Sequence, residues 1–338
     1  MSQLIHLEKN RANLRLRFEL LHEIRRFFDN EKFIEVEAPL IVRLPGQEPN
    51  IMPVELTVHN DKKIAFEGFL HTSPEYTMKK LLAVGWDKIY FLGKCFRDQE
   101  SFGGTHNPEF TMIEWYRART NFESLMTDCE NLTNYLIKYL DGRGYALQQE
   151  NLRRPWKRKH MRDLWHEYVD VNLDDYLTTE AMLALNKALG YRPGDTESYE
   201  ELFYRIFLNK IEPHLGGDAP TIVHHYPREM AALSKIDEQD PNYAERFELY
   251  MNGLEIANAY SELTDANEQQ KRLAEERLER QKLGLTVFDV DQSFIEALES
   301  GLPESAGIAL GVDRLFMALT ACQNIDDLLV LPMSKLFE

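Results

Sequence analysis

Polar and aromatic residues alternate along residues 109–117, which have the composition of a strand. Because alternate residues of a strand lie on the same face, one face of this strand is predicted to carry Phe110, Met112, Glu114 and Tyr116. Acidic and aromatic side chains on one face indicate a binding surface. The alternative is an amphipathic strand on which Glu114 is simply solvated.

A pair of carboxylates is predicted on a second hairpin. Asn252-Gly253 is the strongest short-range indication of a two-residue hairpin turn, with Met251 paired to Leu254. This register makes Glu248 and Glu255 diagonal neighbours, about 7–8 Å apart at Cα. Two buried carboxylates this close repel unless a cation or a proton lies between them, so a hard divalent metal fits there. Two solvated acids on an exposed hairpin are the alternative.

Two further segments have residue types suited to binding. Residues 307–314 lead from a short apolar strand into a helix, and the glycines of the strand let a backbone or a ligand approach closely. In Ser73-Pro74-Glu75, a serine N-cap, a proline at the first helical position and an acid in the first turn predict the start of a helix.

The elements that must position these residues are predicted from apolar periodicity. Over residues 14–28, apolar side chains recur at three and four residues, which predicts an amphipathic helix. A half-exposed strand follows over residues 34–38, and Pro39 ends it. Residues 89–96 and 109–117 are expected to form an antiparallel hairpin with a long polar loop.

The remaining segments carry no catalytic pattern. Asp265 and Glu268 form a capping box for a charged helix that reaches Lys282 and serves as surface scaffold. Residues 125–220 contain helical patterns but no chemical motif, and no role is assigned to them. Within residues 153–162, six of ten residues are Lys or Arg. A solvated strand edge is the simpler interpretation of this basic run, and a partner-docking patch is the alternative.

Composition excludes several classes of protein. A chain of 338 residues with 43% hydrophobic and 28% charged residues has a substantial core and is not disordered. No stretch has the roughly 18 consecutive apolar residues of a membrane span, and residues 1–10 lack the apolar part of a signal peptide, so a cytoplasmic protein without a membrane partner is expected. The net charge of −17 disfavours broad nucleic-acid binding. Cys95, Cys129 and Cys322 have no paired spacing and are expected to be reduced, partly buried thiols.

In their order along the chain, these segments resemble the three signature motifs of class II aminoacyl-tRNA synthetases, and in detail the catalytic domain of lysyl-tRNA synthetases. Residues 14–39 resemble the first, dimer-forming motif, residues 96–116 the second and residues 307–314 the third. Thr72-Ser73-Pro74-Glu75 and residues 247–262 are similar to lysine-specific sites. The resemblance implies an α+β fold, an antiparallel sheet flanked by helices, and no P-loop or GxGxxG motif competes with it.

The resemblance also implies roles for individual residues. Arg97 on the α-phosphate and Arg314 on the terminal phosphate are the catalytic guanidiniums, and Mg²⁺ is assigned to Glu248 and Glu255. The implied ATP-binding residues are Arg97, Asp98, Gln99, Glu100, His106, Asn107, Phe110, Glu255, Ile256, Gly311 and Arg314. Either Gln99 or Glu100 takes the adenine-contacting role. The implied amino-acid pocket consists of Ser73, Pro74, Glu75, Glu114, Tyr116, Asn258, Tyr260, Glu262 and Ala309.

These residue types suit the formation of an aminoacyl adenylate. A carboxylate that attacks the α-phosphorus is repelled by the phosphates, so a divalent cation and two guanidinium groups are needed to neutralise the charge. The planar donors of arginine stay charged at any relevant pH. A lysine-like substrate brings two ammonium groups, which are tolerated in a desolvated pocket only beside carboxylates such as Glu75, Glu114 and Glu262.

One branch of the family fits best. Lysyl-tRNA synthetases carry an N-terminal OB-fold, for which the chain has no room, so residues 1–338 are expected to be one catalytic domain without an anticodon-binding domain. This organisation resembles the elongation factor P lysine ligases, which attach a β-lysyl group to the ε-amine of a lysine on elongation factor P. Ala309 agrees, because the ligases have alanine where lysyl-tRNA synthetases have glycine.

The leading hypothesis is therefore a homodimeric ligase that activates lysine or (R)-β-lysine with ATP and Mg²⁺ and modifies elongation factor P, with tRNA disfavoured as the acceptor. A minimal lysyl-tRNA synthetase that charges tRNA is one alternative. A non-catalytic paralogue that binds an amino acid as a regulatory signal is the other alternative. Such a paralogue is expected to lose the residues that bind ATP, but Arg97, Glu248, Glu255 and Arg314 are all present.

Overall fold

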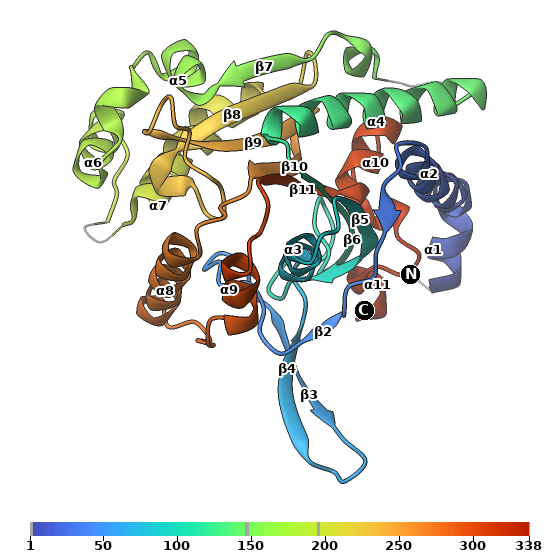
Figure 1. Cartoon of the computed structure of the whole chain (residues 1–338). Coiled ribbons are helices and arrows are strands. Elements are labelled where there is room, and N and C mark those ends of the chain that lie inside the picture. Colours follow the sequence, from blue (N-terminus) through green and yellow to red (C-terminus); the bar gives the residue numbers. More distant parts are fainter. Residues whose placement is uncertain (1–2, 146–148, 195–196, 338) are drawn as a thin grey trace.

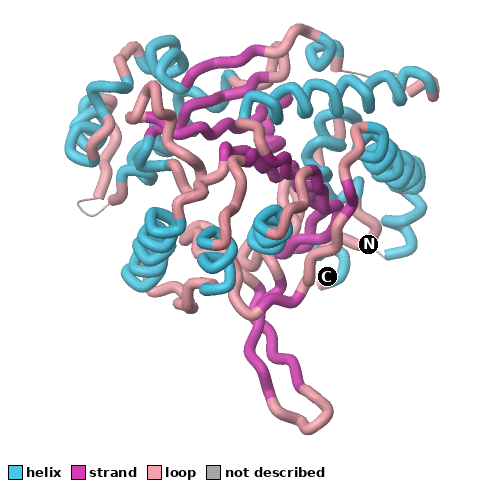
Figure 2. The backbone as a smooth tube through the Cα atoms, viewed as in Figure 1, coloured by secondary structure: helices cyan, strands magenta, loops and turns pink. Residues whose placement is uncertain are grey.

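A mostly antiparallel sheet forms the centre of the molecule. The computed structural model describes residues 3–145, 149–194 and 197–337. Within these residues, eight strands form the main sheet in the order β1 (Ile34–Glu35), β5 (Lys88–Phe96), β6 (Glu109–Ala118), β11 (Ser305–Gly311), β10 (Leu254–Ser261), β9 (Tyr243–Met251), β8 (Thr221–Pro227) and β7 (Lys157–His160). The two outermost pairs, β1–β5 and β7–β8, are parallel and the inner pairs are antiparallel. The predicted α+β fold is confirmed (Figure 2).

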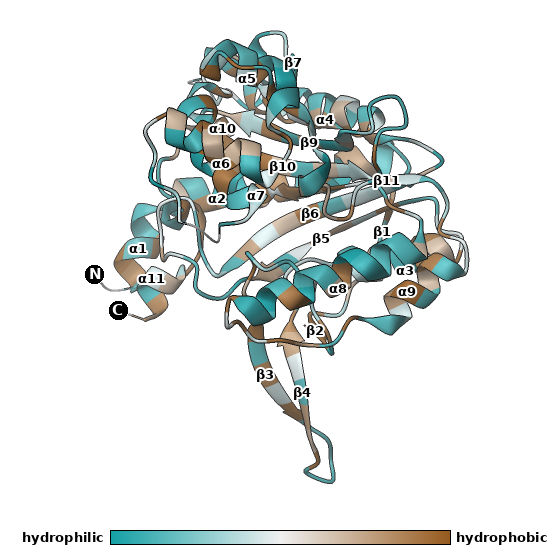
Figure 3. Cartoon of the chain, turned by 90° about the vertical axis from the view of Figure 1, so that its left-hand side faces the viewer, coloured by the Kyte–Doolittle hydropathy of each residue, from teal (hydrophilic) through white to brown (hydrophobic). Residues whose placement is uncertain are grey.

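Helices cover both faces of this sheet. On one face, α2 (Arg11–Asn30), α4 (Phe122–Gly142) and α10 (Val312–Thr320) bury side chains such as Leu20, Leu132 and Phe316 against the sheet. On the other face lie α3 (Glu75–Ala83), α8 (Ala266–Lys282) and α9 (Gln292–Glu299), and the outer surface of α8 is hydrophilic (Figure 3). The short helices α1 (Gln3–Lys9) and α11 (Met333–Leu336) lie next to each other near the two ends of the chain (Figures 1 and 3).

The β7–β8 end of the sheet carries a second layer of helices. The helices α5 (Met161–Val169), α6 (Thr179–Ala188) and α7 (Tyr199–Ile206) share an apolar cluster with β8 and β9. This region includes much of the stretch 125–220, to which the sequence assigned no role. The basic residues within 153–162 agree with the interpretation as a strand edge. Lys157, Arg158 and Lys159 lie on the edge strand β7 and form ion pairs with acidic residues.

A small sheet projects from the body of the molecule. Its strands are ordered β2 (Ile41–Val42), β4 (Ala65–Leu70) and β3 (Val54–His59), and the β3–β4 hairpin extends away from the rest of the chain (Figures 1 and 2). The segment that joins β2 to β3 lies against α8. There, the guanidinium of the buried Arg280 donates hydrogen bonds to the carbonyl oxygens of Glu48 and Ile51.

Local predictions hold where the pattern is strong. The turn at Asn252-Gly253 pairs Met251 with Leu254 as expected, and a bulge follows Glu255. The strand predicted over residues 34–38 is shorter in the structure, where only Ile34–Glu35 has the hydrogen-bonding pattern of a strand.

Two smaller expectations also have outcomes. The capping box at α8 is half present, because Asp265 accepts from the backbone N–H of Glu268 whereas the Glu268 carboxylate pairs with Arg272. Cys95, Cys129 and Cys322 are free thiols, as expected. In the described part of the chain, no helix is both long and apolar enough to cross a membrane.

Candidate active site

The predicted ATP and amino-acid residues meet around one cavity of about 570 Å³. It lies on the sheet face that bears α3 and α8. Residues that the sequence predicted and that line the cavity are Ser73, Glu75, Arg97, Glu100, His106, Asn107, Phe110, Glu248, Glu255, Ile256, Asn258, Tyr260, Ala309, Gly311 and Arg314. They come from α3, β6, β9, β10, β11, α10 and the adjoining loops, so segments more than 200 residues apart converge here.

Six predicted residues do not line the cavity: Asp98, Gln99 and Pro74, and also Glu114, Tyr116 and Glu262, which lie behind its amino-acid end. Gln99 is exposed at a backbone φ of 60°, and Asp98 uses its backbone N–H to bridge to the carbonyl oxygen of Met52. Pro74 is buried at the start of α3, where it has a structural role. Glu100 lines the cavity, with Oε2 3.9 Å from His106 Nε2, so the geometry favours Glu100 over Gln99 for an adenine contact.

Two guanidinium groups lie at the phosphate end. Arg314 donates to the backbone oxygen of Glu255 at 3.1 Å, and its Nη2 lies 2.7 Å from His106 Nε2. Burial and the charge of Arg314 lower the pKa of His106, so its imidazole is neutral and can accept this hydrogen bond. The Arg97 guanidinium lies over the ring of Phe110, 5.2 Å from its centroid. A flat nucleobase and an anionic phosphate therefore have matching partners side by side.

The arginines are held by a buried network that joins the three motifs. Arg17 on α2 forms an ion pair with Asp313, the residue before Arg314. The other oxygen of Asp313 accepts the backbone N–H of Thr111 on β6, 2.7 Å away. Because Arg17 and Asp313 are both buried, their positions are tightly constrained, and the residues of the second and third motifs are aligned by the first.

Glu248 and Glu255 lie on one face, as the hairpin register predicts. Glu248 is buried, and its carboxylate accepts from Tyr226 at 2.6 Å, from Tyr250 at 2.7 Å and from Arg246 at 2.7 Å. The sequence prediction missed Arg246, although the two-residue period of a strand places it on the same face as Glu248.

Glu255 is the more accessible carboxylate of the pair. Its side chain is 42% exposed within the cavity, and its Oε2 lies 3.7 Å from Arg314 Nη1. Withdrawal from bulk water and the nearby charge of Glu248 raise the pKa of Glu255 to about 7. Among the described residues, no group of three or more His, Cys, Asp or Glu forms a metal site. Mg²⁺ uses only one or two carboxylates when phosphates supply other ligands, so this pair suits it.

The amino-acid end of the cavity has two layers. Thr72, Ser73 and Glu75, at and just before the start of α3, reach the wall. Glu114, Tyr116 and Glu262 were predicted to line the pocket but are buried behind it. The reason is that these three side chains project from central strands, or from the end of one, directly beneath α3.

The buried layer connects to the wall through hydrogen bonds. Glu114 accepts from the Ser73 hydroxyl at 2.6 Å and from the Tyr116 hydroxyl at 3.1 Å. Burial and the charge of Glu75 raise the pKa of Glu114 to about 8. A carboxyl group that is largely protonated at neutral pH is thus held directly behind a wall hydroxyl and accepts its hydrogen bond, which orients that hydroxyl.

A buried lysine links the remaining acids. Lys79 Nζ lies 2.6 Å from Glu75 Oε1 and 2.6 Å from Glu262 Oε2, and the Lys79 side chain is 1% exposed. Burial alone would lower the pKa of Lys79, but the two carboxylates raise it, so the ammonium stays charged. Lys79 was missed, although its spacing of four residues from Glu75 is a recognisable helical ion-pair signal.

The floor of the pocket is formed by β11. Ala309 lies between Glu114 on β6 and Asn258 on β10, and its methyl group lines the cavity. A Cβ built on Gly307 would clash with the Tyr116 ring and the Glu262 carboxylate, so only glycine fits there.

Other cavity residues had no signal in the sequence. They lie in the loop before β3 and on helices without a motif, and tertiary packing alone brings them to the site. They include Glu48, Asn50, Glu200, Tyr204, Glu212 and Glu276.

Comparisons with known proteins agree with this geometry. The model of the class II tRNA synthetases (D, K and N) matches residues 2–335. The chain is 35% identical to "Elongation factor P--(R)-beta-lysine ligase" of Proteus mirabilis, with 96% of each chain covered. It is 36% identical to proteins of the same name from Photorhabdus laumondii and Yersinia enterocolitica, again with 96% of each chain covered. The motifs, the cavity and these matches together place the chain in the class II tRNA synthetase family of the D, K and N type.

Proposed function

We propose that this chain activates lysine or (R)-β-lysine with ATP and transfers the aminoacyl group to the ε-amine of a lysine on elongation factor P. The observation that carries the proposal is the single cavity in which Arg97 and Arg314 face the carboxylate-rich wall at Glu75. The relatives with 35–36% identity are named for this ligase activity.

The proposed adenylation relies on positioning and charge. Arg97 holds the α-phosphate, Phe110 and Arg314 enclose the adenine, and the substrate carboxylate attacks the α-phosphorus in line. Fixed guanidiniums cost no reorganisation at the moment of reaction, so they stabilise the charge that develops. Holding both reactants in one cavity is worth about 7–11 kcal/mol in favourable intramolecular cases.

In the proposal, Mg²⁺ is held by Glu255 and the neighbouring Glu248. The ion supplies charge neutralisation at the phosphates. Glu255 contributes the more accessible carboxylate, while Arg246, Tyr226 and Tyr250 hold Glu248 in position.

The proposed selection of the amino acid follows from the acidic wall. Glu75 receives one ammonium group directly, and Glu114 acts through Ser73. Asn258 and Tyr260, which are hydrogen-bonded to each other at 3.1 Å, line the opposite side. An uncharged analogue would leave these groups without a partner, so it would bind poorly.

Amino-acid-dependent ATP–pyrophosphate exchange tests the first half of the proposal. Exchange is expected with at least one of lysine and (R)-β-lysine, and its absence with both would contradict adenylation. Mass spectrometry then tests the second half, by comparing elongation factor P and tRNA as acceptors. Labelled tRNA with unmodified elongation factor P would favour the minimal synthetase instead.

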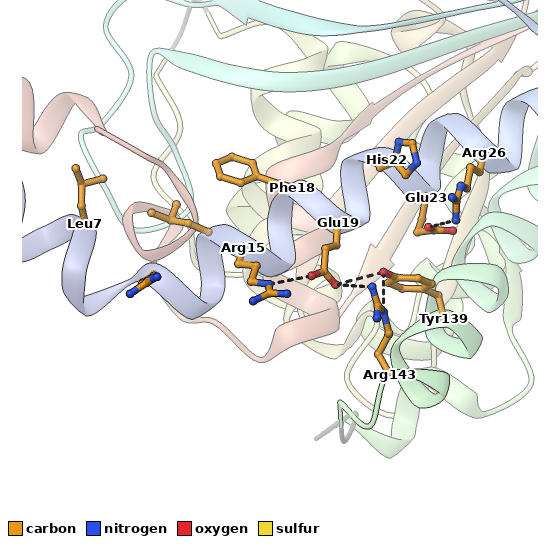
Figure 4. Close-up of a pocket in the computed structure, with 11 residues that line it drawn as sticks. Leu7, Arg15, Phe18, Glu19, His22, Glu23, Arg26, Tyr139 and Arg143 are labelled. Carbon is orange, nitrogen blue, oxygen red and sulfur yellow. Dashed lines mark hydrogen bonds and ion pairs between the residues drawn. The ribbon is translucent and has the colours of Figure 1, made fainter.

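We also propose that two copies of the chain associate through the outer face of α2. A concavity of about 720 Å³ lies on this face, between α2 and α4, and is separate from the active-site cavity. Phe18 is 54% exposed at its edge, beside the Glu19–Arg15 ion pair (Figure 4). Light scattering tests the proposal: Phe18→Asp is expected to yield monomers from a dimeric parent, and a monomeric parent would refute it.

A further inference from the structure

A second cavity adjoins the active site. It has a volume of about 530 Å³ and shares Glu48, Thr72, Ser73 and Glu75 with the active-site cavity. The residues proposed to bind the nucleotide, and Asn258, line only the first cavity, whereas Ser73 and Glu75 line both.

Three polar residues belong to the walls of these adjoining cavities. Glu48 lines both cavities, Tyr76 lines the second and Glu276 lines the first. Glu48 Oε2, Tyr76 Oη and Glu276 Oε2 are buried, and none of these atoms has a hydrogen-bond partner among the described residues. The carboxylates of Glu48 and Glu276 have no ion-pair partner among the described residues. Of the nearby cations, Lys79 is already paired with Glu75, and Arg97 is proposed to bind a phosphate. Unpaired buried acceptors are costly, so this set indicates a ligand with several hydrogen-bond donors.

The segment that carries Glu48 is rigidly positioned. Arg280 Nη1 donates to the Glu48 carbonyl oxygen at 2.9 Å, and the Gln47 side chain donates to the Asp289 carbonyl oxygen at 3.0 Å. The Glu48 carboxylate lies against the Cα of Gly46, where any Cβ would displace it. The structure thus holds the Glu48 carboxylate at a fixed place, with no hydrogen-bond partner for its Oε2 among the described residues.

The charge of the second cavity favours a cation. Its lining includes four acidic residues and two basic residues, a formal charge of −2: Glu48, Glu75, Asp289, Asp291, Arg43 and Lys80. Lys80 is already paired with Asp291 at 2.6 Å. Burial and the charge of Glu75 raise the pKa of Glu48, which makes its carboxylate a better proton acceptor.

We infer that the second cavity admits the acceptor lysine, and that Glu48 receives its ammonium group and takes a proton from it. This inference rests on the proposed function. The step balances as follows: the ammonium gives one proton to Glu48, and the neutral amine attacks the carbonyl carbon of the aminoacyl adenylate. The C–N bond forms, the C–O bond to phosphate breaks, and AMP leaves with the electron pair. The second amine proton passes to water. Tyr76 and Glu276 hold the ammonium before transfer.

The two halves of the reaction separate this role from amino-acid binding. In Glu48→Gln, single-turnover transfer from preformed adenylate to elongation factor P is expected to fall about 100-fold or more, within the range for general bases. Pyrophosphate exchange and the amino-acid KM are expected to stay within about twofold of the parent. Hydroxylamine, a small neutral nucleophile that needs no proton removed before attack, is expected to trap the adenylate at the parent rate.

Two further variants keep the test specific. Gly46→Ala should displace the Glu48 carboxylate without removing it, and a similar selective loss of transfer is expected. Glu55→Gln makes the same charge change on the exposed surface of β3 and is expected to behave as the parent.

The contrary outcomes are distinct. Normal transfer in Glu48→Gln would overturn the inference, as would a rise in the amino-acid KM that matches the loss of transfer. Absence of exchange in the parent protein would instead overturn the proposed function, and the inference with it.

Discussion

Removing the ammonium of Lys79 tests the two-layered amino-acid pocket most directly. Lys79 is the buried cation between Glu75 and Glu262, with both N–O distances at 2.6 Å. Lys79→Met keeps the length of the side chain and its contact with the Phe294 ring, over which Nζ lies at 5.6 Å, but removes the charge. The buried carboxylate of Glu262 and the half-buried carboxylate of Glu75 then face each other without a counter-ion.

The expected cost follows from burial. Breaking a buried ion pair by removing one partner costs about 3–5 kcal/mol, because the remaining charge is left uncompensated. Lys80→Met is the matched control on the next residue. The Lys80 side chain is 34% exposed and pairs with Asp291 near the surface, so the expected cost is about 0–1 kcal/mol.

The pH dependence of the loss identifies its cause. In Lys79→Met, Glu262, whose pKa is already raised to about 7 by burial, can relieve the repulsion by taking up a proton. The free energy of unfolding, measured in urea, should therefore fall more at pH 8 than at pH 5.5, relative to the parent at each pH. A deficit that is equal at both pH values, or no larger than that of Lys80→Met, would refute the assigned ion pair.

Three further predictions concern the same pocket. Burial and the charge of Glu75 raise the pKa of Glu114 to about 8, and burial raises that of Glu262 to about 7 despite Lys79. A bound ammonium displaces these protons, so amino-acid affinity measured by calorimetry should increase from pH 6 to pH 8. Because the pKa values are raised in the folded state, the melting temperature of the free protein should decrease over the same range. A flat affinity profile would contradict this reasoning. Glu262→Ala should abolish amino-acid-dependent pyrophosphate exchange, because the buried Lys79 loses one of its two carboxylate partners, and the loss of a buried ion-pair partner costs about 3–5 kcal/mol. Near-normal exchange would overturn the assignment. Gly307→Ala should raise the amino-acid KM in the same assay, since its Cβ would displace Tyr116 and Glu262; an unchanged KM would refute the close approach.

Short-range patterns predicted the sheet that carries the site. The Asn252-Gly253 turn determined the pairing of β9 with β10, and the two-residue period placed Phe110, Glu114 and Tyr116 on one face. A turn and a strand period act over only a few residues, so the sequence displays them directly.

The depth of each side chain was not predictable in the same way. Strand parity assigns Phe110 and Glu114 to one face, yet Phe110 lines the cavity and Glu114 is 1% exposed beneath α3. The helix that covers Glu114 comes from a segment about thirty residues earlier in the chain, and no pattern within β6 encodes its arrival. Glu48 illustrates the same limit, because a loop without periodicity is placed by long-range contacts, here with α8 and with the segment that precedes α9.

The division between wall and buried layer also has a chemical consequence. If Glu114 and Glu262 faced the substrate directly, each would have to be desolvated by the ligand itself, at a cost in binding energy. In the folded chain that desolvation has already occurred, and Lys79, Ser73 and Tyr116 hold the acids in place. An entering ammonium therefore meets preorganised carboxyl groups and displaces protons from them rather than water. Selectivity for a doubly cationic substrate then depends on the buried layer as much as on the residues that touch the ligand, which is why Lys79 and Gly307 are the most informative positions to change.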